Sequence, residues 1–471
     1  MIEGLKPYAD YKESGQKWLG GVPAHWDLTP GHAAFAKRKE PNRGMREKTV
    51  LSLSYGRIKV KSTDKQHGLV PESYETYQVV NEGNIIIRGT DLQNDHTSLR
   101  IGLSRNRGII SSAYLCLETQ LSTTPDYGFQ ILNVFDLTKA IYRFGSGLRQ
   151  NLDHGEIKRL PIFLPPLDEQ AAIVRFLDHA NRKIDGFIRA KRKLIGLLNE
   201  QKQAIIHRAV TRGLNPDVPL KPSGIPWLGD IPRHWEVRKI KSLVSTFGGM
   251  TPNKGEVAYW KGRIPWVSPK DMKVREIHDS QDHISTTALR QTGITLIQPP
   301  AVLIVVRGMI LARTFPTAIT AVPVTINQDM KALVPKTGLN SEYFVSLLTG
   351  IQRDLLLLIE IAGHGTCCLR TDAWGSFMVP IPPLSEQSEI VQQLKDRLSI
   401  QNAAITRTER EIALMQEYRT RLTADIVTGK LDVREAASKL PEVKPDEADP
   451  SDKSEMSALS DNLDESIEEE P

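Results

Sequence analysis

The residues of this chain that could do chemistry form one short pattern of carboxylates and a lysine. Pro125-Asp126 followed by Glu156-Ile157-Lys158 has the groups that a nuclease arranges around a divalent cation. Part of the sequence is repeated, and the second copy has Ala373 and Gly375 in place of Glu156 and Lys158. Because the repeat does not need these side chains, we interpret them as solvated charges on a connecting loop. A metal-dependent nuclease is the alternative interpretation.

Motifs for a bound cofactor are incomplete. Pro299-Pro300 lies in QPPA, which lacks the polar and aromatic residues of a methyltransferase base-binding motif. GSGLRQ and GHGTCC lack the third glycine of a dinucleotide-binding loop, and no GxxxxGK[ST] phosphate loop occurs. Cys116, Cys367 and Cys368 show no CxxC spacing, which predicts buried thiols and no metal site. An enzyme that uses a nucleotide cofactor is therefore disfavoured.

The charge distribution favours a polyanionic partner. The net charge is +5, but Pro441 to Pro471 contain twelve acidic residues against Lys444 and Lys453, which leaves +15 on residues 1–440. A basic folded part is typical of proteins that bind DNA or RNA. The acidic tail, rich in Pro and Ser, is predicted to be disordered.

Candidate DNA contacts lie in loops between strand-like runs. Arg and Lys bind phosphates, which gives affinity without sequence information, whereas Asn and Gln can read base edges. The phosphate candidates are Arg100, Arg105, Arg107, Lys254, Lys270, Lys273, Arg275 and Arg307. Asn327 and Gln328 are the candidates for base readout. For each of them, an ordinary solvated charge or turn residue is the alternative.

Two long helices must position these loops. PPLDEQ begins at Pro165 and PPLSEQ begins at Pro382, each followed by a long run of apolar residues at coiled-coil spacing. Asp168 and Ser385 are the expected N-caps. The apolar stripe that we expect to join the helices contains Ile173, Leu177, Ile184, Phe187, Leu194, Leu198, Leu394, Leu398, Ile405, Ile412, Met415 and Leu422.

A second motif recurs before each globular region. SGQKWLGGVPAHWDL from Ser14 returns as SGIPWLGDIPRHWEV from Ser223, and Trp18, Trp26, Trp227 and Trp235 are predicted to anchor turns. Strand-like runs follow both copies, which predicts α+β domains within a tandem repeat. The expected boundaries are globular domains at 1–164 and 214–381, helices at 165–213 and 382–432, and the tail at 433–471. Since no signal peptide or apolar transmembrane run is visible, we expect a cytoplasmic protein.

With both PPL-x-EQ helices and both WLG…P-x-HW motifs, the chain resembles the DNA-specificity subunit of a type I restriction-modification enzyme. Further similar phrases are GIISSAY at Gly108–Tyr114, GRIPWV at Gly262–Val267 and Asn327-Gln328-Asp329. The resemblance covers almost everything except the acidic tail. Within the helices, Lys191, Gln201, Gln401 and Arg419 interrupt the apolar stripe, which could fix register or mark a docking position.

The resemblance implies an antiparallel helix pair between two target-recognition domains, related by a pseudo-two-fold repeat. Each domain would read one half of a bipartite, asymmetric double-stranded DNA site. The resemblance also implies no catalysis and no cofactor in this chain itself. Two methyltransferase subunits that use S-adenosylmethionine would dock on this chain, and a restriction subunit using ATP and magnesium could join. A coiled-coil adaptor without DNA readout is the second alternative, beside the nuclease.

Overall fold

The computed structural model describes residues 5–16, 19–61, 73–90, 92, 99–143, 151–362 and 365–441. The chain divides into two compact units. Unit 1 contains the residues up to Arg189 and those from Ile412, and unit 2 is the continuous stretch Ala190–Glu411. Both boundaries fall inside the long helices, so each unit includes part of both helices.

Unit 1 is built on a four-stranded antiparallel sheet in the order β4-β11-β8-β9. Its strands are β4 Phe35–Arg38, β11 Leu115–Thr119, β8 Ile85–Ile87 and β9 Ile101–Leu103. The two-stranded pairs are β1 Tyr11–Glu13 with β2 Gly21–Pro23, β3 Asp27–Pro30 with β12 Pro161–Leu164, β5 Leu51–Ser54 with β6 Arg57–Val60, and β7 Gln78–Val80 with β10 Gly108–Ile110. Its short helices are α1 Gly31–Ala34, α2 Pro125–Leu137, α3 His154–Arg159 and α11 Arg434–Ser438, with 3-10 turns η1 Arg43–Met45 and η3 Ala140–Arg143.

Unit 2 has a five-stranded sheet in the order β16-β23-β20-β21-β18. Its strands are β16 Val244–Gly248, β23 Met330–Pro335, β20 Val302–Val305, β21 Thr317–Thr320 and β18 Glu276–Ile277. A smaller sheet contains β19 Asp282–Ile284, β17 Ile264–Val267 and β22 Thr325–Ile326, and the pairs are β13 Leu220–Pro222 with β14 Asp230–Pro232, β15 Glu236–Lys239 with β26 Met378–Ile381, and β24 Ile359–Ile361 with β25 Cys367–Leu369. Its helices are α5 Ile240–Leu243, α6 Thr286–Gln291, α7 Ser341–Gly350, α8 Gln352–Leu356 and α9 Thr371–Ser376, with 3-10 turns η4 Val257–Tyr259, η5 Pro269–Asp271 and η6 Met309–Ala312.

The two main sheets share one topology although their sequences differ. At one edge of each sheet lies a strand that directly follows a four-residue helix, β4 after α1 and β16 after α5. The neighbouring strand, β11 or β23, precedes the longest helix of the globular domain, α2 or α7. β4-β11-β8-β9 thus corresponds strand for strand to β16-β23-β20-β21, and all these neighbours are antiparallel. The internal repeat therefore includes the globular regions.

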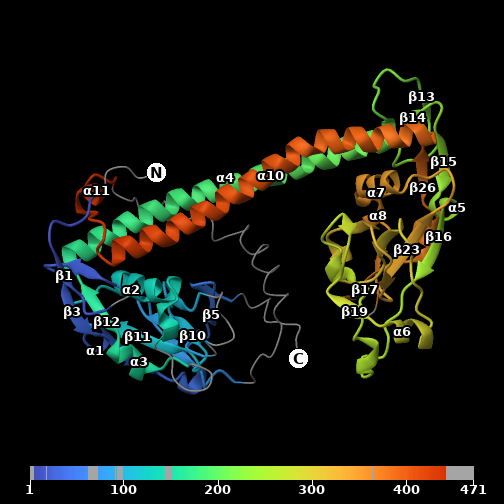
Figure 1. Ribbon diagram of the computed structural model, residues 1–471. Helices are drawn as coiled ribbons and strands as arrows, with labels where there is room; N and C mark the ends of the chain where they lie inside the picture. Colours follow the sequence, from blue (N-terminus) through green and yellow to red (C-terminus); the bar gives the residue numbers. More distant parts are fainter. Residues whose placement is uncertain are drawn as a thin grey trace. The chain divides into compact units, whose positions relative to one another are not determined.

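The long helices are α4 Leu167–Arg212 and α10 Leu384–Val427 (Figure 1). The expectation of N-caps at Asp168 and Ser385 is wrong, because both residues lie inside the first turn. The Pro166 carbonyl accepts from the Gln170 N–H at 2.9 Å, and Pro383 does the same for Gln387 at 3.0 Å. A proline carbonyl thus opens each helix.

Glycines end both helices close to the expected positions. Gly213 and Gly429 have φ of +74° and +76°, the left-handed conformation that commonly terminates a helix. The second helix ends before residue 432, because the Lys430 N–H already turns back to the Asp425 carbonyl at 2.8 Å. Gly429 also has no room for a side chain, since an added Cβ would lie 2.3 Å from Pro23 Cδ.

Within each unit, α4 and α10 run antiparallel. In unit 1, Asp185 of α4 forms an ion pair with Arg419 of α10, while Leu177 shares a core with Leu422 and Ile426 further along. In unit 2, Lys191 Nζ lies 2.7 Å from Glu411 Oε2, and Ile206 and Val210 share a core with Ile390 and Leu394. As residue numbers rise along α4, those of the contacted residues in α10 fall.

The expected apolar stripe is buried unevenly. Buried members are Ile173, Leu177, Ile184, Leu394, Leu398 and Leu422, and partly buried members are Leu198, Ile405, Ile412 and Met415. Phe187 and Leu194 are 37% and 40% exposed. The best buried residues lie where the helices also pack against a domain core. Where the two helices pack only against each other, less of each side chain is buried than where a domain core also packs against them.

Unit 1 is closed by contacts between its two sequence segments. The Asp432 N–H donates to the Lys6 carbonyl at 2.8 Å, and the Tyr11 hydroxyl donates to the Gly429 carbonyl at 3.1 Å. The Arg434 guanidinium lies over the Tyr8 ring, 5.2 Å from its centre. Val433 and Ala437 join the same core as Trp26. The segment after α10 is therefore an integral part of unit 1.

The remaining expectations concern cysteines, the tail and membrane spans. Cys116 and Cys367 are buried, Cys368 is partly buried, and burial raises the pKa of Cys116 to about 12. The expected disordered tail at 433–471 begins too early, because residues 433–441 include α11 and pack in unit 1. Residues 442–471 lie outside the described residues. None of the helices in the described part of the chain is long and apolar enough to span a membrane.

Truncation of the buried stripe should destabilise unit 1 specifically. We expect Leu177→Ala to lower the free energy of unfolding by about 2–5 kcal/mol, because Leu177 is 1% exposed and its loss leaves a cavity. Leu167→Ala is the matched control in the same helix, since Leu167 is 51% exposed and should change stability by less than about 0.5 kcal/mol. Urea denaturation measures both, and equal effects would contradict the assigned packing.

Candidate functional site

The first turn of α4 holds a buried carboxylate that collects the tryptophan motif of unit 1. Glu169 Oε1 accepts from the Tyr8 hydroxyl at 2.5 Å and from the Trp26 indole N–H at 3.0 Å. Glu169 Oε2 lies 2.8 Å from His25 Nε2. Burial and the neighbouring carboxylate together raise the pKa of Tyr8 above its ordinary value. His25 and Trp26 thus have structural partners, while Trp18 lies outside the described residues.

The first turn of α10 repeats this arrangement in unit 2. Glu386 Oε2 lies 2.7 Å from His234 Nε2 and accepts from the Trp235 indole N–H at 3.0 Å. Trp235 is fully buried, and Trp227 stacks on Phe377 with ring centres 5.0 Å apart. The prediction that these tryptophans anchor turns is confirmed for Trp26, Trp227 and Trp235.

The glutamine after each glutamate fastens the globular domain to the helix. Gln170 accepts from the Thr124 N–H at 2.9 Å and donates to the Ser122 and Pro165 carbonyls at 2.8 and 3.0 Å. Thr124 is the N-cap of α2.

Gln387 makes the same three kinds of bond in unit 2. It accepts from the Asn340 N–H at 2.8 Å and donates to the Gly338 and Pro382 carbonyls at 3.0 and 2.9 Å. Asn340 is the N-cap of α7, the counterpart of α2. The Glu-Gln pair of PPL-x-EQ therefore joins the tryptophan motif, the domain helix and the long helix at one point.

The three basic candidates of unit 1 have different environments. Arg100 is 0% exposed, and its Nη1 donates to the Thr90 carbonyl at 2.7 Å. Arg105 and Arg107 lie in the turn between β9 and β10, with side chains 61% exposed. Arg105 pairs with Asp126, and Arg107 donates to Asn81 at 3.1 Å. Only the latter two are placed to meet a ligand, whereas Arg100 supports the fold.

Three basic candidates of unit 2 flank the end of β17. Lys270 Nζ lies 3.2 Å from Asp282 Oδ2, and Lys273 is exposed. The Arg275 guanidinium donates to the Ser346 hydroxyl of α7 at 3.0 Å, and burial lowers its pKa. Arg275 is thus tied to its own domain.

The other four candidates of unit 2 gather around the turn that follows β22. Asn327 is buried, accepts from the Asp329 N–H at 3.1 Å and donates to the Asp329 carboxylate at 3.2 Å. Gln328 is exposed at the tip of this turn. The Arg307 N–H donates to the Asp329 carbonyl at 3.2 Å, and exposed Lys254 lies in the loop that crosses the turn.

The residues of the nuclease hypothesis have structural contacts instead. Asp126 forms an ion pair with Arg105. Glu156 accepts from the Asp153 N–H at 2.9 Å, as part of a capping box that starts α3. Among the described residues, no group of three or more His, Cys, Asp or Glu side chains is arranged to hold a metal ion.

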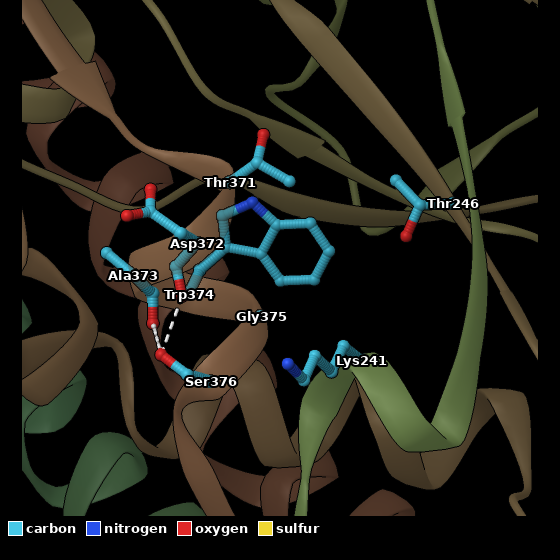
Figure 2. A pocket seen from close by; sticks show the side chains of 8 residues that line it. All are labelled: Lys241, Thr246, Thr371, Asp372, Ala373, Trp374, Gly375 and Ser376. Atoms are coloured by element: carbon cyan, nitrogen blue, oxygen red, sulfur yellow. Dashed lines mark hydrogen bonds between the residues drawn. The ribbon is translucent and has the colours of Figure 1, made fainter.

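One open hollow in unit 2 has a volume of about 710 Å³ and lies between α5, β16 and α9 (Figure 2). Figure 2 shows the Ser376 hydroxyl bonded to two backbone carbonyls, those of Asp372 at 2.6 Å and Ala373 at 3.1 Å. Asp372 itself pairs with Arg370 at 3.1 Å. The polar groups that line this hollow thus stabilise α9.

Comparison with known proteins is consistent with this architecture. The family model described as the type I restriction modification DNA specificity domain matches residues 232–414. The specificity subunit of the Escherichia coli type I restriction enzyme EcoR124I/EcoR124II is 29% identical over 276 residues. This chain is therefore similar to type I DNA-specificity subunits.

The E. coli match covers 58% of this chain and 64% of the relative, so less than two thirds of that protein is matched. The MjaVIII specificity subunit of Methanocaldococcus jannaschii is 24% identical over 452 residues, covering 90% of this chain and 97% of the relative. A solved structure from work on assembly and conformational transition of the type I restriction-modification system matches with a TM-score of 0.60. It covers 87% of this chain and 99% of that chain at 17% identity, a likeness of fold.

Sequence reasoning missed one functional candidate in unit 2. The Thr251 hydroxyl donates to the Gln328 side-chain oxygen and joins two exposed loops of unit 2. Thr251 lies 77 residues from Gln328 in the sequence. A single threonine in a loop carries no signal for such a contact, so only the fold reveals it.

Loss of the buried carboxylate should weaken the attachment between the domain and α4. We expect Glu169→Ala to lower the free energy of unfolding by about 2–4 kcal/mol, because the Tyr8 hydroxyl and the Trp26 N–H would lose their acceptor while buried. Asp168→Ala is the control on the same turn, and it should cost at most about 1 kcal/mol since Asp168 is exposed. Chemical denaturation followed by tryptophan fluorescence would show the difference, and identical midpoints would refute the proposed attachment.

Proposed function

We propose that this chain is the sequence-specific, non-catalytic DNA-binding subunit of a type I restriction-modification complex. Residues 1–164 and 214–381 are the two target-recognition domains, and each reads one half of a bipartite, asymmetric site. The long helices α4 and α10 set the gap between the halves and dock two methyltransferase subunits.

The observation that carries the proposal is the repetition of one domain topology with different exposed side chains. Both domains have the same strand order and the same Glu-Gln attachment to a long helix. Their exposed turns differ, with Arg105 and Arg107 in one unit and Lys254 and Gln328 in the other. Two related frameworks with unlike surfaces suit the recognition of two unlike half-sites.

The described side chains divide into phosphate contacts and supports. Exposed Arg105, Arg107, Lys254, Lys273 and Arg307 supply affinity that depends on salt, as contacts to phosphates do. Lys270 is also a phosphate contact, although its ammonium group forms an ion pair with Asp282. Arg100 and Asn327 support the loops from within the domains. Arg275 is exposed, and its guanidinium is bonded to the Ser346 hydroxyl.

The chemistry of the complex belongs to partner subunits under this proposal. The methyltransferase subunits bind S-adenosylmethionine and methylate adenine, and a restriction subunit with ATP and magnesium can join them. This chain contributes the choice of DNA sequence.

Co-expression with a type I methyltransferase subunit from the same source tests the function. We expect the purified complex to methylate adenine in one asymmetric, gapped motif, which sequencing of the treated DNA would reveal. A folded complex that methylates no defined motif, or a purified chain that cuts DNA with magnesium alone, would overturn the proposal.

The role of the helices as a spacer makes a second prediction. Seven residues added after Arg189 and seven added before Ile412 lengthen each helix by about 10 Å, which equals about three base pairs of DNA. We expect the gap of the methylated motif to grow by about that number, with both half-sites unchanged. Insertion in one helix alone is the control, since it breaks the register of the pair. A doubly inserted chain that still uses the original gap would refute the spacer role.

A further inference from the structure

Two equivalent turns occur at the same place in the two units. In unit 1, Ser111 to Tyr114 connect β10 to β11, and in unit 2, Asn327 to Asp329 connect β22 to β23. β11 and β23 occupy the same position in the matching strand orders. The turns are therefore topological counterparts despite their different sequences.

The internal hydrogen bonds of the turns correspond as well. The first residue accepts, through its side chain, from the N–H two residues later: Ser111 from Ala113 at 3.3 Å, and Asn327 from Asp329 at 3.1 Å. Its carbonyl accepts from the N–H three residues later, that of Tyr114 at 3.1 Å or Met330 at 3.3 Å. Such bonds are typical of turns that Ser and Asn initiate. By this alignment, Ser112 corresponds to Gln328, and both are exposed.

The turn of unit 2 rests on a clamped loop. The Trp266 indole donates to the Met250 carbonyl at 2.9 Å, and the Trp260 indole donates to the Asn253 carbonyl at 3.2 Å. The Met250 N–H donates to the Ile326 carbonyl at 2.9 Å. A Cβ on Gly249 would lie 1.8 Å from the Asn327 carbonyl oxygen, so only glycine allows this approach. The loop is thereby fixed beside Gln328.

The turn of unit 1 is braced by a buried amide. Gln78 of β7 donates through Nε2 to the Ser111 carbonyl at 3.2 Å and to the Tyr114 carbonyl at 2.7 Å. Its side chain is almost completely buried. The backbone of the turn is therefore rigid on both sides of Ser112. The Ser112 side chain is exposed, and the stability of the fold does not depend on it.

Basic residues accompany both turns. Arg88 directly follows β8, and Arg307 follows β20 by two positions; both are exposed. These two strands are the neighbours of β11 and β23. Each turn therefore combines a rigid backbone, one exposed polar tip and a nearby arginine, the combination expected where base readout needs preorganised groups and a phosphate anchor.

We propose that Ser112 and Gln328 are specificity-determining residues, each contacting a base edge of duplex DNA in its own half of the recognition site. This inference rests on the proposed function and names the residues that distinguish the two half-sites. Thr251 is the positioning residue of Gln328, since its hydroxyl holds the amide oxygen.

The chemistry of Gln328 predicts which bases it prefers. The bond from Thr251 takes one of the two acceptor positions of the amide oxygen and leaves both N–H groups to donate. In the major groove, guanine offers two acceptors, thymine offers one and adenine offers one beside its donor, whereas cytosine presents only a donor. We therefore expect Gln328 to read guanine, adenine or thymine and to discriminate against cytosine.

Selection of random duplexes by the full chain, co-expressed with its methyltransferase subunit, tests the inference. For Gln328→Ala, we expect a loss of base preference by about tenfold to a hundredfold at one or two positions of a single half-site. Ser112→Ala should reduce preference by about threefold to tenfold in the other half-site, because a hydroxyl makes fewer bonds. Gln393→Ala, an exposed glutamine on α10, is the matched control and should leave the motif unchanged.

Three further variants separate base contact from a structural effect. Gln328→Glu replaces donors by acceptors and should move the preference toward cytosine at the same position. Thr251→Val should relax the preference at that position, and Thr251→Ser should restore it. Thermal unfolding should be the same for all of these variants, because the substituted groups are at least partly exposed.

The outcomes distinguish this inference from the proposed function. A selected wild-type motif that stays the same in Gln328→Ala and Ser112→Ala overturns the inference alone. A loss of preference in both half-sites from either variant also overturns it, since each residue is assigned to one half. A wild-type complex that selects no sequence overturns the proposed function and the inference together.

Discussion

The structure depends on a pair of side chains in the first turn of each long helix. A carboxylate that is removed from water needs hydrogen-bond donors, and the tryptophan motif supplies them to Glu169 and Glu386. The adjacent Gln170 and Gln387 meet the N-terminus of the domain helix on the other side. One turn of helix thus fixes three elements that are far apart in sequence. The same solution in both units explains why these motifs repeat while the regions between them differ.

This arrangement separates the framework from the surface. In unit 2 the contacts that hold the turn at Asn327 come from backbone groups, the Asn327 side chain and the indoles of Trp260 and Trp266, and none requires a particular residue at position 328. In unit 1, Gln78 binds backbone carbonyls and is equally indifferent to residue 112. Substitutions at residues 112 and 328 can therefore change DNA recognition without destabilising the packing of the domains. Stability and specificity are set by different residues, which reduces the conflict between them.

Much of the framework was predictable from the sequence. Long apolar periodicity and the repeated prolines and glycines define the two helices within a few residues, and the aromatic motif identifies buried anchors. The helix starts were misplaced because a side-chain cap was expected where a proline carbonyl, which has no sequence signal, accepts the first bond. The common strand order could not be predicted, because many different apolar residues are compatible with a buried strand. Arg100 shows the same limit for sites, since a charge between strand-like runs predicts a phosphate contact, although backbone carbonyls bind it inside the fold.

The closure of unit 1 by residues from both of its segments has a consequence for biosynthesis. Unit 2 is one continuous stretch, so all of its residues have left the ribosome once Glu411 has emerged. Unit 1 must wait for the segment beyond Ile412, because Gly429 and Asp432 bind Tyr11 and Lys6. The usual vectorial order, in which the N-terminal domain matures first, is thus reversed. The nascent N-terminal region stays incomplete until the residues around Asp432 have been synthesised.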